Sequence, residues 1–209
     1  MISLFSNLYE YITKKEEIYL LLVGLDGSGK TTLSEGIKTI YTKKHGLKPS
    51  EIIPTIGMNV VKFETNEANV TIWDLGGEKE LRSIWNEYYK SCHGLILVAK
   101  INDESRKKEL MEELQKLDKD ERLKDVPIYI VLNHFIENNV EEGHDSKTKI
   151  RDSNNQELLD LDFELLSSTR KVNVFTIDAA NLTDVDRSVN TMVDQLLKKK
   201  RTINSEDFV

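Results

Sequence analysis

Short apolar runs rich in β-branched and aromatic residues alternate with longer stretches whose apolar residues recur every three or four positions. This alternation is typical of a mostly parallel sheet flanked by helices. The apolar runs predict strands near residues 18–24, 59–64, 69–74, 94–100, 127–132 and 172–177. The periodic stretches predict helices near residues 30–43, 80–90, 103–119, 154–167 and 185–200.

The second and third predicted strands form a hairpin. Only the polar turn at residues 65–68 joins them, which suits antiparallel pairing and not a helical crossover. The fold class we predict is α/β, a six-stranded, mostly parallel sheet with one antiparallel edge strand, flanked by helices. Residues 137–153 are polar and lack a sustained apolar period, which predicts a mobile surface loop.

The first residues of the chain predict a short amphipathic helix. Ile2, Phe5, Tyr9 and Ile12 recur at three- and four-residue spacing, so one face of the helix would be apolar. That face would either dock on the protein's own surface or lie in a membrane interface, and the pattern does not decide between the two.

Composition narrows the class of protein. At 209 residues the chain is long enough for one well-cored domain and short for two. Its formal net charge of -7 argues against nucleic acid as a partner. Cys92 is the only cysteine, and no apolar run approaches the roughly 18 residues needed to span a bilayer. We expect a cytoplasmic protein and a monomer.

Residues 24–31 match the phosphate-binding pattern G-x-x-x-x-G-K-[ST] between a predicted strand and a predicted helix. Glycines in this pattern let backbone amides approach phosphate oxygens, and the helix N-terminus favours an anion. Lys30 would neutralise β- and γ-phosphate oxygens, and the Thr31 hydroxyl would bind Mg²⁺. The alternative, a Gly-rich turn with a chance Lys-Thr, fits this context far less well.

Two further segments follow in the order expected of a phosphate and metal site. Asp74 ends the third predicted strand, where it would support the magnesium from just outside its direct ligands. The backbone amide of Gly77 would approach the γ-phosphate, because no side chain blocks it. Thr55 would close on the metal from the opposite side, so Thr31, Thr55 and Asp74 are the predicted metal-binding residues.

These motifs resemble those of the Arf family of small GTPases: GLDGSGKTT at 24–32, PTIGMNV at 54–60 and WDLGG at 73–77. Residues 73–94 are similar in particular to the Arf-related proteins of the Golgi, and the resemblance thins after residue 132. It implies an N-terminal helix at 1–16, a P-loop small G-protein domain at 17–201 and a C-terminal tail at 202–209. It also implies an interswitch hairpin that moves with nucleotide, GTP, GDP and Mg²⁺ as cofactors, and a switch in Golgi and vesicle membrane traffic.

The resemblance and the P-loop pattern together predict the residues of the site. Glu78 and Gly77 take the catalytic positions. The predicted nucleotide-binding residues are Asp26, Gly27, Ser28, Gly29, Lys30, Thr31, Thr32, Thr55, Gly77, Asn133, His134 and Ala179.

The resemblance also implies partners. An exchange factor, an activating protein and effectors would bind the switch regions around Met58, Trp73 and Tyr88, unless these three side chains are ordinary packing residues. Membrane contact would be peripheral, through the N-terminal helix, with cycling between the cytoplasm and Golgi-type membranes. Ile2 stands where Arf proteins carry a myristoylated glycine, so an acetylated N-terminus is expected instead, as in the Arf-related proteins. The basic residues 198–201 would help at an anionic membrane, although a helix C-terminus alone favours such residues.

Two departures from the family pattern bear on activity. Glu78 stands at the position of the family's water-orienting glutamine, and an ionised carboxylate cannot donate a hydrogen bond, which predicts slow hydrolysis. Residues 133–136 read Asn-His-Phe-Ile where the family has N-K-x-D, so Ile136 replaces the guanine-binding carboxylate. Asp178 and Glu137 are candidate replacements without the expected geometry, and Lys100 occupies a position that is usually acidic.

Three hypotheses follow. The first is a Mg²⁺-dependent GTP/GDP switch of the Arf-related type that hydrolyses slowly. The second is a pseudo-GTPase interaction module that binds nucleotide weakly or without selectivity. The third, a P-loop kinase or general NTPase, is weaker because nothing in the sequence resembles a lid or an acceptor site.

Overall fold

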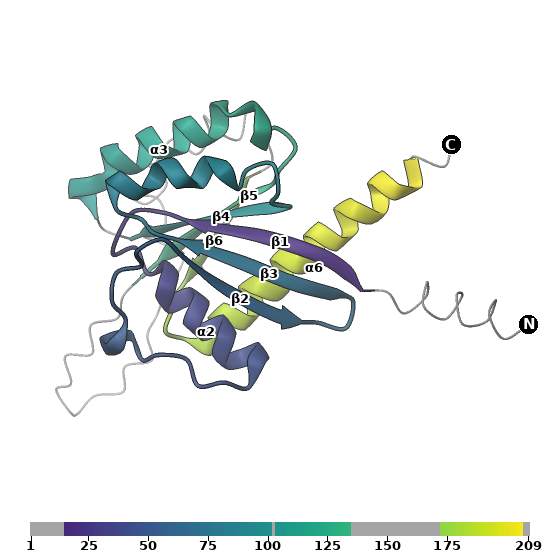
Figure 1. The fold of residues 1–209 in the computed structure, drawn as a ribbon, viewed down its shortest axis with the longest axis horizontal. Helices are drawn as coiled ribbons and strands as arrows, with labels where there is room; N and C mark the ends of the chain where they lie inside the picture. Colours follow the sequence, from purple (N-terminus) through teal and green to yellow (C-terminus); the bar gives the residue numbers. More distant parts are fainter. Residues whose placement is uncertain (1–14, 102, 135–171, 207–209) are drawn as a thin grey trace, which may run out of the picture.

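The computed structural model describes residues 15–101, 103–134 and 172–206 (Figure 1). Its centre is a six-stranded sheet in the order β2-β3-β1-β4-β5-β6. The strands are β1 (Glu16–Val23), β2 (Met58–Glu64), β3 (Ala68–Leu75), β4 (Gly94–Lys100), β5 (Ile128–Asn133) and β6 (Val172–Ile177). β2 pairs antiparallel with β3, from Met58 opposite Leu75 to Glu64 opposite Asn69, and the other pairs are parallel. The predicted fold class is confirmed.

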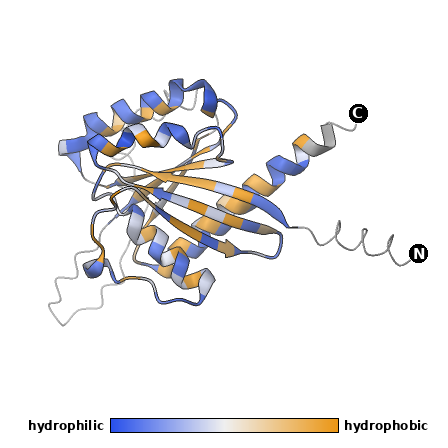
Figure 2. Cartoon of the chain, in the orientation of Figure 1, coloured by the Kyte–Doolittle hydropathy of each residue, from blue (hydrophilic) through white to orange (hydrophobic). Residues whose placement is uncertain are grey.

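Alternation along β1 divides the core into two layers. Leu20 and Leu22 pack towards α2 (Lys30–Thr42) and α6 (Leu182–Glu206) on one face of the sheet. Leu21 and Val23 face the opposite way, towards α3 (Lys107–Lys119) and the 3₁₀ helix η2 (Lys79–Glu87). Because both faces of β1 are covered, the strand is apolar along most of its length, as Figure 2 shows for the inner strands of the sheet.

The structure revises the ends of three predicted helices and shows the type of one of them. The helix predicted at 80–90 is η2, in which the buried Arg82 and Trp85 lie three residues apart and so on one face of a 3₁₀ helix. The helix predicted from residue 103 begins with a 3₁₀ turn, η3 (Glu104–Arg106), before α3. α6 begins at Leu182 and continues to Glu206, so residues 202–206, predicted as tail, are helical. Two more short 3₁₀ turns are η1 (Pro49–Glu51) and η4 (Glu121–Leu123).

Three expectations fall on residues outside the described ranges: the N-terminal helix at 1–16 for all but its last two residues, the loop at 137–153 and the helix at 154–167. Within the described ranges, no helix is both long enough and apolar enough to cross a membrane.

The basic end of α6 makes contacts within the chain. Lys199 donates to the Asp125 carbonyl oxygen, and Lys200 Nζ donates to the Glu17 carbonyl oxygen at 2.6 Å. Arg201 pairs with Glu67 at 2.7 Å. Such exposed pairs contribute little stability individually. They do fasten the last turns of α6 to the start of β1 and to the β2–β3 turn.

His93 joins the start of β4 to β1. The Tyr19 amide donates to His93 Nδ1 at 2.9 Å, and the His93 amide donates to the Tyr19 carbonyl oxygen at 2.7 Å. The two rings also pack together, with centroids 5.3 Å apart. Burial lowers the pKa of His93 below its ordinary value, Lys200 lowers it further, and Glu16 opposes both effects.

We predict that His93 makes stability pH-dependent. Its pKa is lower in the folded chain than the ordinary 6.5 of the unfolded chain, so the unfolded chain binds the extra proton first as pH falls. The stabilising contribution is therefore complete above about pH 6.5 and declines below it. Denaturant unfolding at pH 7.5 and 5.5 should give wild type a steeper loss of unfolding free energy than His93→Gln. An unchanged difference between the two chains at both pH values would contradict this role.

Candidate nucleotide and metal site

The phosphate-binding loop lies between β1 and α2 and requires glycine for two different reasons. At Gly24 a Cβ would lie 2.2 Å from the Val98 carbonyl oxygen of β4, so no side chain fits. At Gly29, the residue that precedes α2, φ is 95°, in the left-handed region that favours glycine. Gly29 supplies no side chain to cap α2, which leaves the amides at this helix end to an anionic ligand.

Lys30 is a buried cation at the centre of this loop. Its side chain is inside the protein, and Nζ donates to the Leu25 carbonyl oxygen at 2.9 Å. Burial lowers its pKa to about 8, against the attraction of Asp74 and Asp26. The buried Ser28 Oγ nearby has no hydrogen-bond partner. A phosphate oxygen would satisfy both groups.

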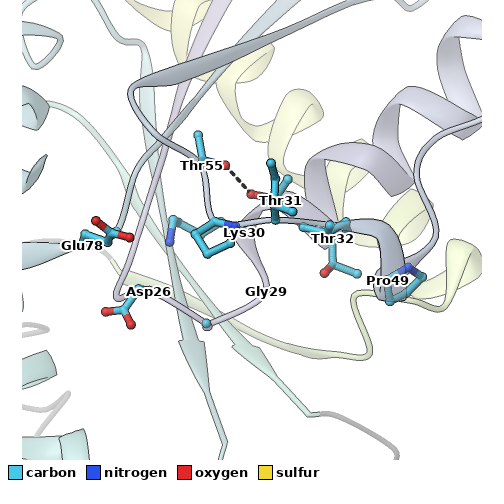
Figure 3. A pocket seen from close by; sticks show the side chains of 13 residues that line it. Asp26, Gly29, Lys30, Thr31, Thr32, Pro49, Thr55 and Glu78 are labelled. Atoms are coloured by element: carbon cyan, nitrogen blue, oxygen red, sulfur yellow. Dashed lines mark hydrogen bonds between the residues drawn. The ribbon is translucent and has the colours of Figure 1, made fainter.

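Two hydroxyls and one carboxylate form the predicted metal side. Thr31 Oγ1 and Thr55 Oγ1 lie 2.8 Å apart, although 24 residues separate them in the chain (Figure 3). Asp74 is fully buried, and its Oδ2 accepts from Ser34 Oγ at 2.9 Å, whereas its Oδ1 has no partner. Burial raises the pKa of Asp74. These residues fit a hard, oxygen-liganded cation such as Mg²⁺, because a cation would both hold the hydroxyl oxygens and compensate the orphaned carboxylate oxygen.

The described residues hold no cluster of three or more His, Cys, Asp or Glu side chains that would bind a metal by themselves. A cation at Thr31 and Thr55 would therefore take its remaining ligands from water and from a bound phosphate, which is how Mg²⁺ is usually held at nucleotide sites.

A cavity of about 240 Å³ brings most of the predicted residues together (Figure 3). Asp26, Gly27, Gly29, Lys30, Thr31, Thr32, Thr55, Gly77 and Glu78 line it. Its wall also includes Pro49, Ile52, Ile53 and Pro54, which the sequence analysis did not assign to the site. The sequence could have indicated these four residues, because they precede Thr55 in the same loop. One of them, Ile53, is apolar and has a side chain that is 78% exposed.

Gly77 closes the cavity opposite the phosphate-binding loop. A Cβ there would lie 2.5 Å from both Lys30 Nζ and the Gly24 carbonyl oxygen, so only glycine allows this approach. The exposed Glu78 lies beside it, at the same end of the cavity as Asp26 in Figure 3. A hydrogen bond from Arg106 lowers the pKa of Asp26 and keeps that carboxylate ionised.

The three residues predicted on the base side do not line this cavity. Asn133 Nδ2 donates to the Ser28 carbonyl oxygen at 3.0 Å, and Asn133 Oδ1 accepts from the Ala179 amide at 2.9 Å. Asn133 therefore ties β5 to the phosphate-binding loop and to the loop before α6. The His134 amide continues the sheet by donating to the Ile177 carbonyl oxygen.

Of the two candidates for a replacement base-binding carboxylate, only Asp178 lies in the part of the chain that the structure describes. Asp178 Oδ1 accepts from the Ala180 amide at 2.9 Å, a bond within its own loop. Glu137 and Ile136 lie outside the described residues.

Two arginines beside the site were not anticipated. The buried Arg82 of η2 pairs with Glu109 of α3 at 2.8 Å, and Arg106 pairs with Asp26 at 2.6 Å. Arg82 also lies 3.7 Å from the Asp26 carboxylate. A sequence signal existed at Arg82, a charged residue three positions before the apolar Trp85 in a short amphipathic segment.

The residues expected to bind effectors are partly packed and partly exposed. The Trp73 and Tyr88 rings lie 5.2 Å apart and are half-buried. Met58 is 41% exposed, and Val60 and Ile84 nearby in the sequence are also exposed apolar residues.

A glycine-rich loop between β1 and α2, closed by an Asp-x-x-Gly segment at the end of β3, defines a P-loop G domain. The family model for ADP-ribosylation factors matches residues 2–196. The chain therefore belongs to the ADP-ribosylation factor (Arf) family of small GTPases, as its motifs predicted.

The relatives agree with this assignment. The chain is 41% identical over 134 residues to ADP-ribosylation factor-related protein 1 of Rattus norvegicus, covering 64% of this chain and 67% of that protein. It is 38% identical over 135 residues to ADP-ribosylation factor-like protein 3 of Saccharomyces cerevisiae, covering 64% and 67%. Its fold matches the structure of the Arl6 small GTPase from Trypanosoma brucei with bound GppNp, with a TM-score of 0.66 and 22% identity over 87% of this chain and 98% of that one.

We predict that Lys30→Met stabilises the ligand-free protein. The pKa of Lys30 falls from 10.5 to about 8 on folding, so below pH 8 the fold carries a buried charge that it disfavours. At 1.36 kcal/mol per pKa unit, Lys30→Met should raise the unfolding free energy at pH 7 by about 1–3 kcal/mol. The gain should shrink at pH 9.5, where wild-type Lys30 is largely neutral when folded.

Lys108→Met is the matched control, because Lys108 is exposed on α3 and Lys and Met have similar helix propensities. Denaturant unfolding in phosphate-free buffer is the measurement. No gain from Lys30→Met at pH 7 would show that burial of this charge does not cost the empty fold stability.

Proposed function

We propose that this chain is a Mg²⁺-dependent GTP/GDP switch of the Arf-related type with slow intrinsic hydrolysis. The observation that carries the proposal is the convergence of the buried Lys30, the paired hydroxyls of Thr31 and Thr55, and the half-unpaired Asp74 at one end of the phosphate-binding loop. A magnesium polyphosphate supplies both the anion that Lys30 needs and the cation that Asp74 needs.

The bound cation would neutralise charge on the β- and γ-phosphate oxygens. The chain's own residues perform the binding steps. Lys30 contacts the phosphates, Thr31 holds the cation from the start of α2, and Thr55 approaches it from the loop before β2. Because Thr55 is in a loop, its contact with Thr31 is the part of the site that nucleotide state would make or break.

Fewer contacts are available for recognition of the base than for recognition of the phosphates. Ile136 replaces the carboxylate, and two charge-assisted hydrogen bonds to guanine at roughly 1.5–3 kcal/mol each are at stake. Asn133 and Asp178 are engaged with the chain's own backbone. Affinity would therefore come mainly from the phosphates and the metal, and guanine preference would be about two to four decades weaker than with the carboxylate.

The cellular role we propose follows the resemblance of residues 73–94 to the Arf-related proteins of the Golgi. It is membrane traffic at the Golgi, with peripheral attachment through the N-terminal helix and cycling from the cytoplasm. Exchange factor, activating protein and effectors would bind a monomer at the switch regions around Met58, Trp73 and Tyr88. The half-exposed aromatic pair and the exposed apolar residues beside it suit such a protein-binding surface.

The second candidate, a pseudo-GTPase interaction module, is favoured by one feature: Ile136 and Glu78 alter base recognition and water positioning together. It predicts the same surfaces without turnover or switching.

Calorimetric titration of the purified chain with GTP, GDP, ATP and XTP, each with and without Mg²⁺, tests the proposal. We expect Mg²⁺-dependent binding of the triphosphates with a small preference for guanine. Ile136→Asp should raise GTP affinity by about two to four decades and leave ATP affinity unchanged. Absence of Mg²⁺-dependent binding to any triphosphate would contradict the proposal.

We predict that Glu78→Gln speeds hydrolysis. Glu78 lines the cavity, where its negative charge repels the γ-phosphate, whereas an amide can both orient water and donate a hydrogen bond. The single-turnover rate of GTP hydrolysis should rise about tenfold, equivalent to about 1.4 kcal/mol in the barrier. Glu80→Gln is the matched control, because Glu80 is exposed two residues further along and does not line the cavity. Equal rates for Glu78→Gln and wild type would contradict this role.

A further inference from the structure

Both carbonyl groups of the Gly76–Gly77 pair are held by side chains of the helix that follows. Trp85 Nε1 donates to the Gly76 carbonyl oxygen at 3.0 Å. Arg82 Nε donates to the Gly77 carbonyl oxygen at 2.8 Å. Trp85 is 1% exposed and Arg82 is 7% exposed, so neither bond competes with bulk water.

These bonds fix the direction of two amides. In a trans peptide the N–H points opposite to the C=O, and the described chain has no cis peptide bonds. The Gly77 amide shares a peptide with the Gly76 carbonyl, and the Glu78 amide shares one with the Gly77 carbonyl. Both amides therefore point away from η2.

The phosphate-binding loop lies on the other side of the glycine pair. A Cβ on Gly77 would lie 2.5 Å from Lys30 Nζ and 2.6 Å from the Asp26 amide. Amides that point away from η2 at this position face the same space as the Lys30 ammonium.

Arg82 is itself held in place by carboxylates of α3. Its Nη1 pairs with Glu109 at 2.8 Å and with Glu113 at 3.4 Å, both on α3. Lys116 holds Glu113 in turn, at 2.8 Å. The planar guanidinium thus bonds α3 with one nitrogen and the glycine pair with another, an arrangement that a lysine ammonium cannot reproduce.

We propose that Arg82 and Trp85 are positioning residues that aim the Gly77 and Glu78 amides at the third phosphate of a nucleoside triphosphate. This inference rests on the proposed function, and it adds the device that distinguishes triphosphate from diphosphate. Amides held in place before binding lose no freedom when the phosphate arrives, so they favour the ligand that reaches them. A diphosphate ends short of them and gains nothing.

The test compares affinities for GppNHp and GDP, both with Mg²⁺, in wild type, Arg82→Lys and Trp85→Phe. Arg82→Lys keeps the charge that Glu109 requires, and Trp85→Phe keeps an aromatic ring while removing the donor. Each variant should bind GppNHp about tenfold more weakly, equivalent to about 1.4 kcal/mol, with GDP affinity within about twofold of wild type.

Two controls match the chemistry away from the site. Arg122→Lys alters an arginine that donates to the Asn86 carbonyl oxygen and pairs with Asp120, and Tyr129→Phe removes a buried aromatic donor to the Met192 carbonyl oxygen. Neither should change the ratio of the two affinities. Thermal melts of every variant identify any that fail to fold.

The possible outcomes are distinct. Loss of GppNHp affinity alone, in either folded variant, supports the inference. Equal loss for both nucleotides, or an unchanged ratio in both variants, overturns it and leaves the proposed function standing. Wild-type protein that binds neither nucleotide overturns the proposed function and the inference together.

Discussion

Two opposite charges buried at the carboxyl edge of the sheet govern the structure of this protein. Lys30 follows β1 through the glycine-rich loop, and Asp74 lies near the end of β3, opposite Leu22 in the parallel register. Burial disfavours the charged form of both, lowering the pKa of Lys30 and raising that of Asp74. The fold therefore holds a cation and an anion that would each be stabilised by a counter-ion. Gly77 keeps the space beside Lys30 Nζ free of a side chain.

Two different kinds of contact hold the elements around the site in place. On the side of α3, Arg82 and Arg106 join the phosphate-binding loop, η2 and α3 through carboxylates at Asp26 and Glu109. Along the sheet, a chain of rings runs from His93 through Tyr19 and Trp73 to Tyr88. A displacement of β2 and β3 would have to rearrange the rings, whereas a displacement of η2 would have to break ion pairs. The β2–β3 hairpin is thus held by ring contacts and η2 by ion pairs, and the two kinds of contact differ in their dependence on salt concentration.

The sequence predicted the sheet and the phosphate side of the site because both depend on short-range patterns. Strand runs, the hairpin turn and the glycine spacing are local, and all six strands lie within two residues of their predicted ends. The 3₁₀ type of η2 was not predicted, because apolar spacings of three and four over nine residues do not separate a 3₁₀ helix from an α-helix. Arg82 was missed because its partners Glu109 and Glu113 lie 27 and 31 residues away, on an element whose packing no local pattern specifies. The C-terminal end of α6 was placed too early, since no local pattern specifies the contacts of Lys200 and Arg201 with β1 and the β2–β3 turn that hold this part of the helix.

Asn133, which was predicted to bind nucleotide, has a structural role that does not depend on any ligand. Both ends of its amide bond the chain's own backbone, one at Ser28 and the other at Ala179, so its loss would loosen the phosphate-binding loop itself. In the family pattern, a carboxylate at residue 136 hydrogen-bonds the guanine base and not the protein backbone. By the same pattern, Ile136 in its place would remove contacts to the base. At the phosphate-binding loop, by contrast, a side chain at Gly77 would collide with Lys30 Nζ and with the Gly24 carbonyl oxygen, so a substitution there would disturb the fold itself.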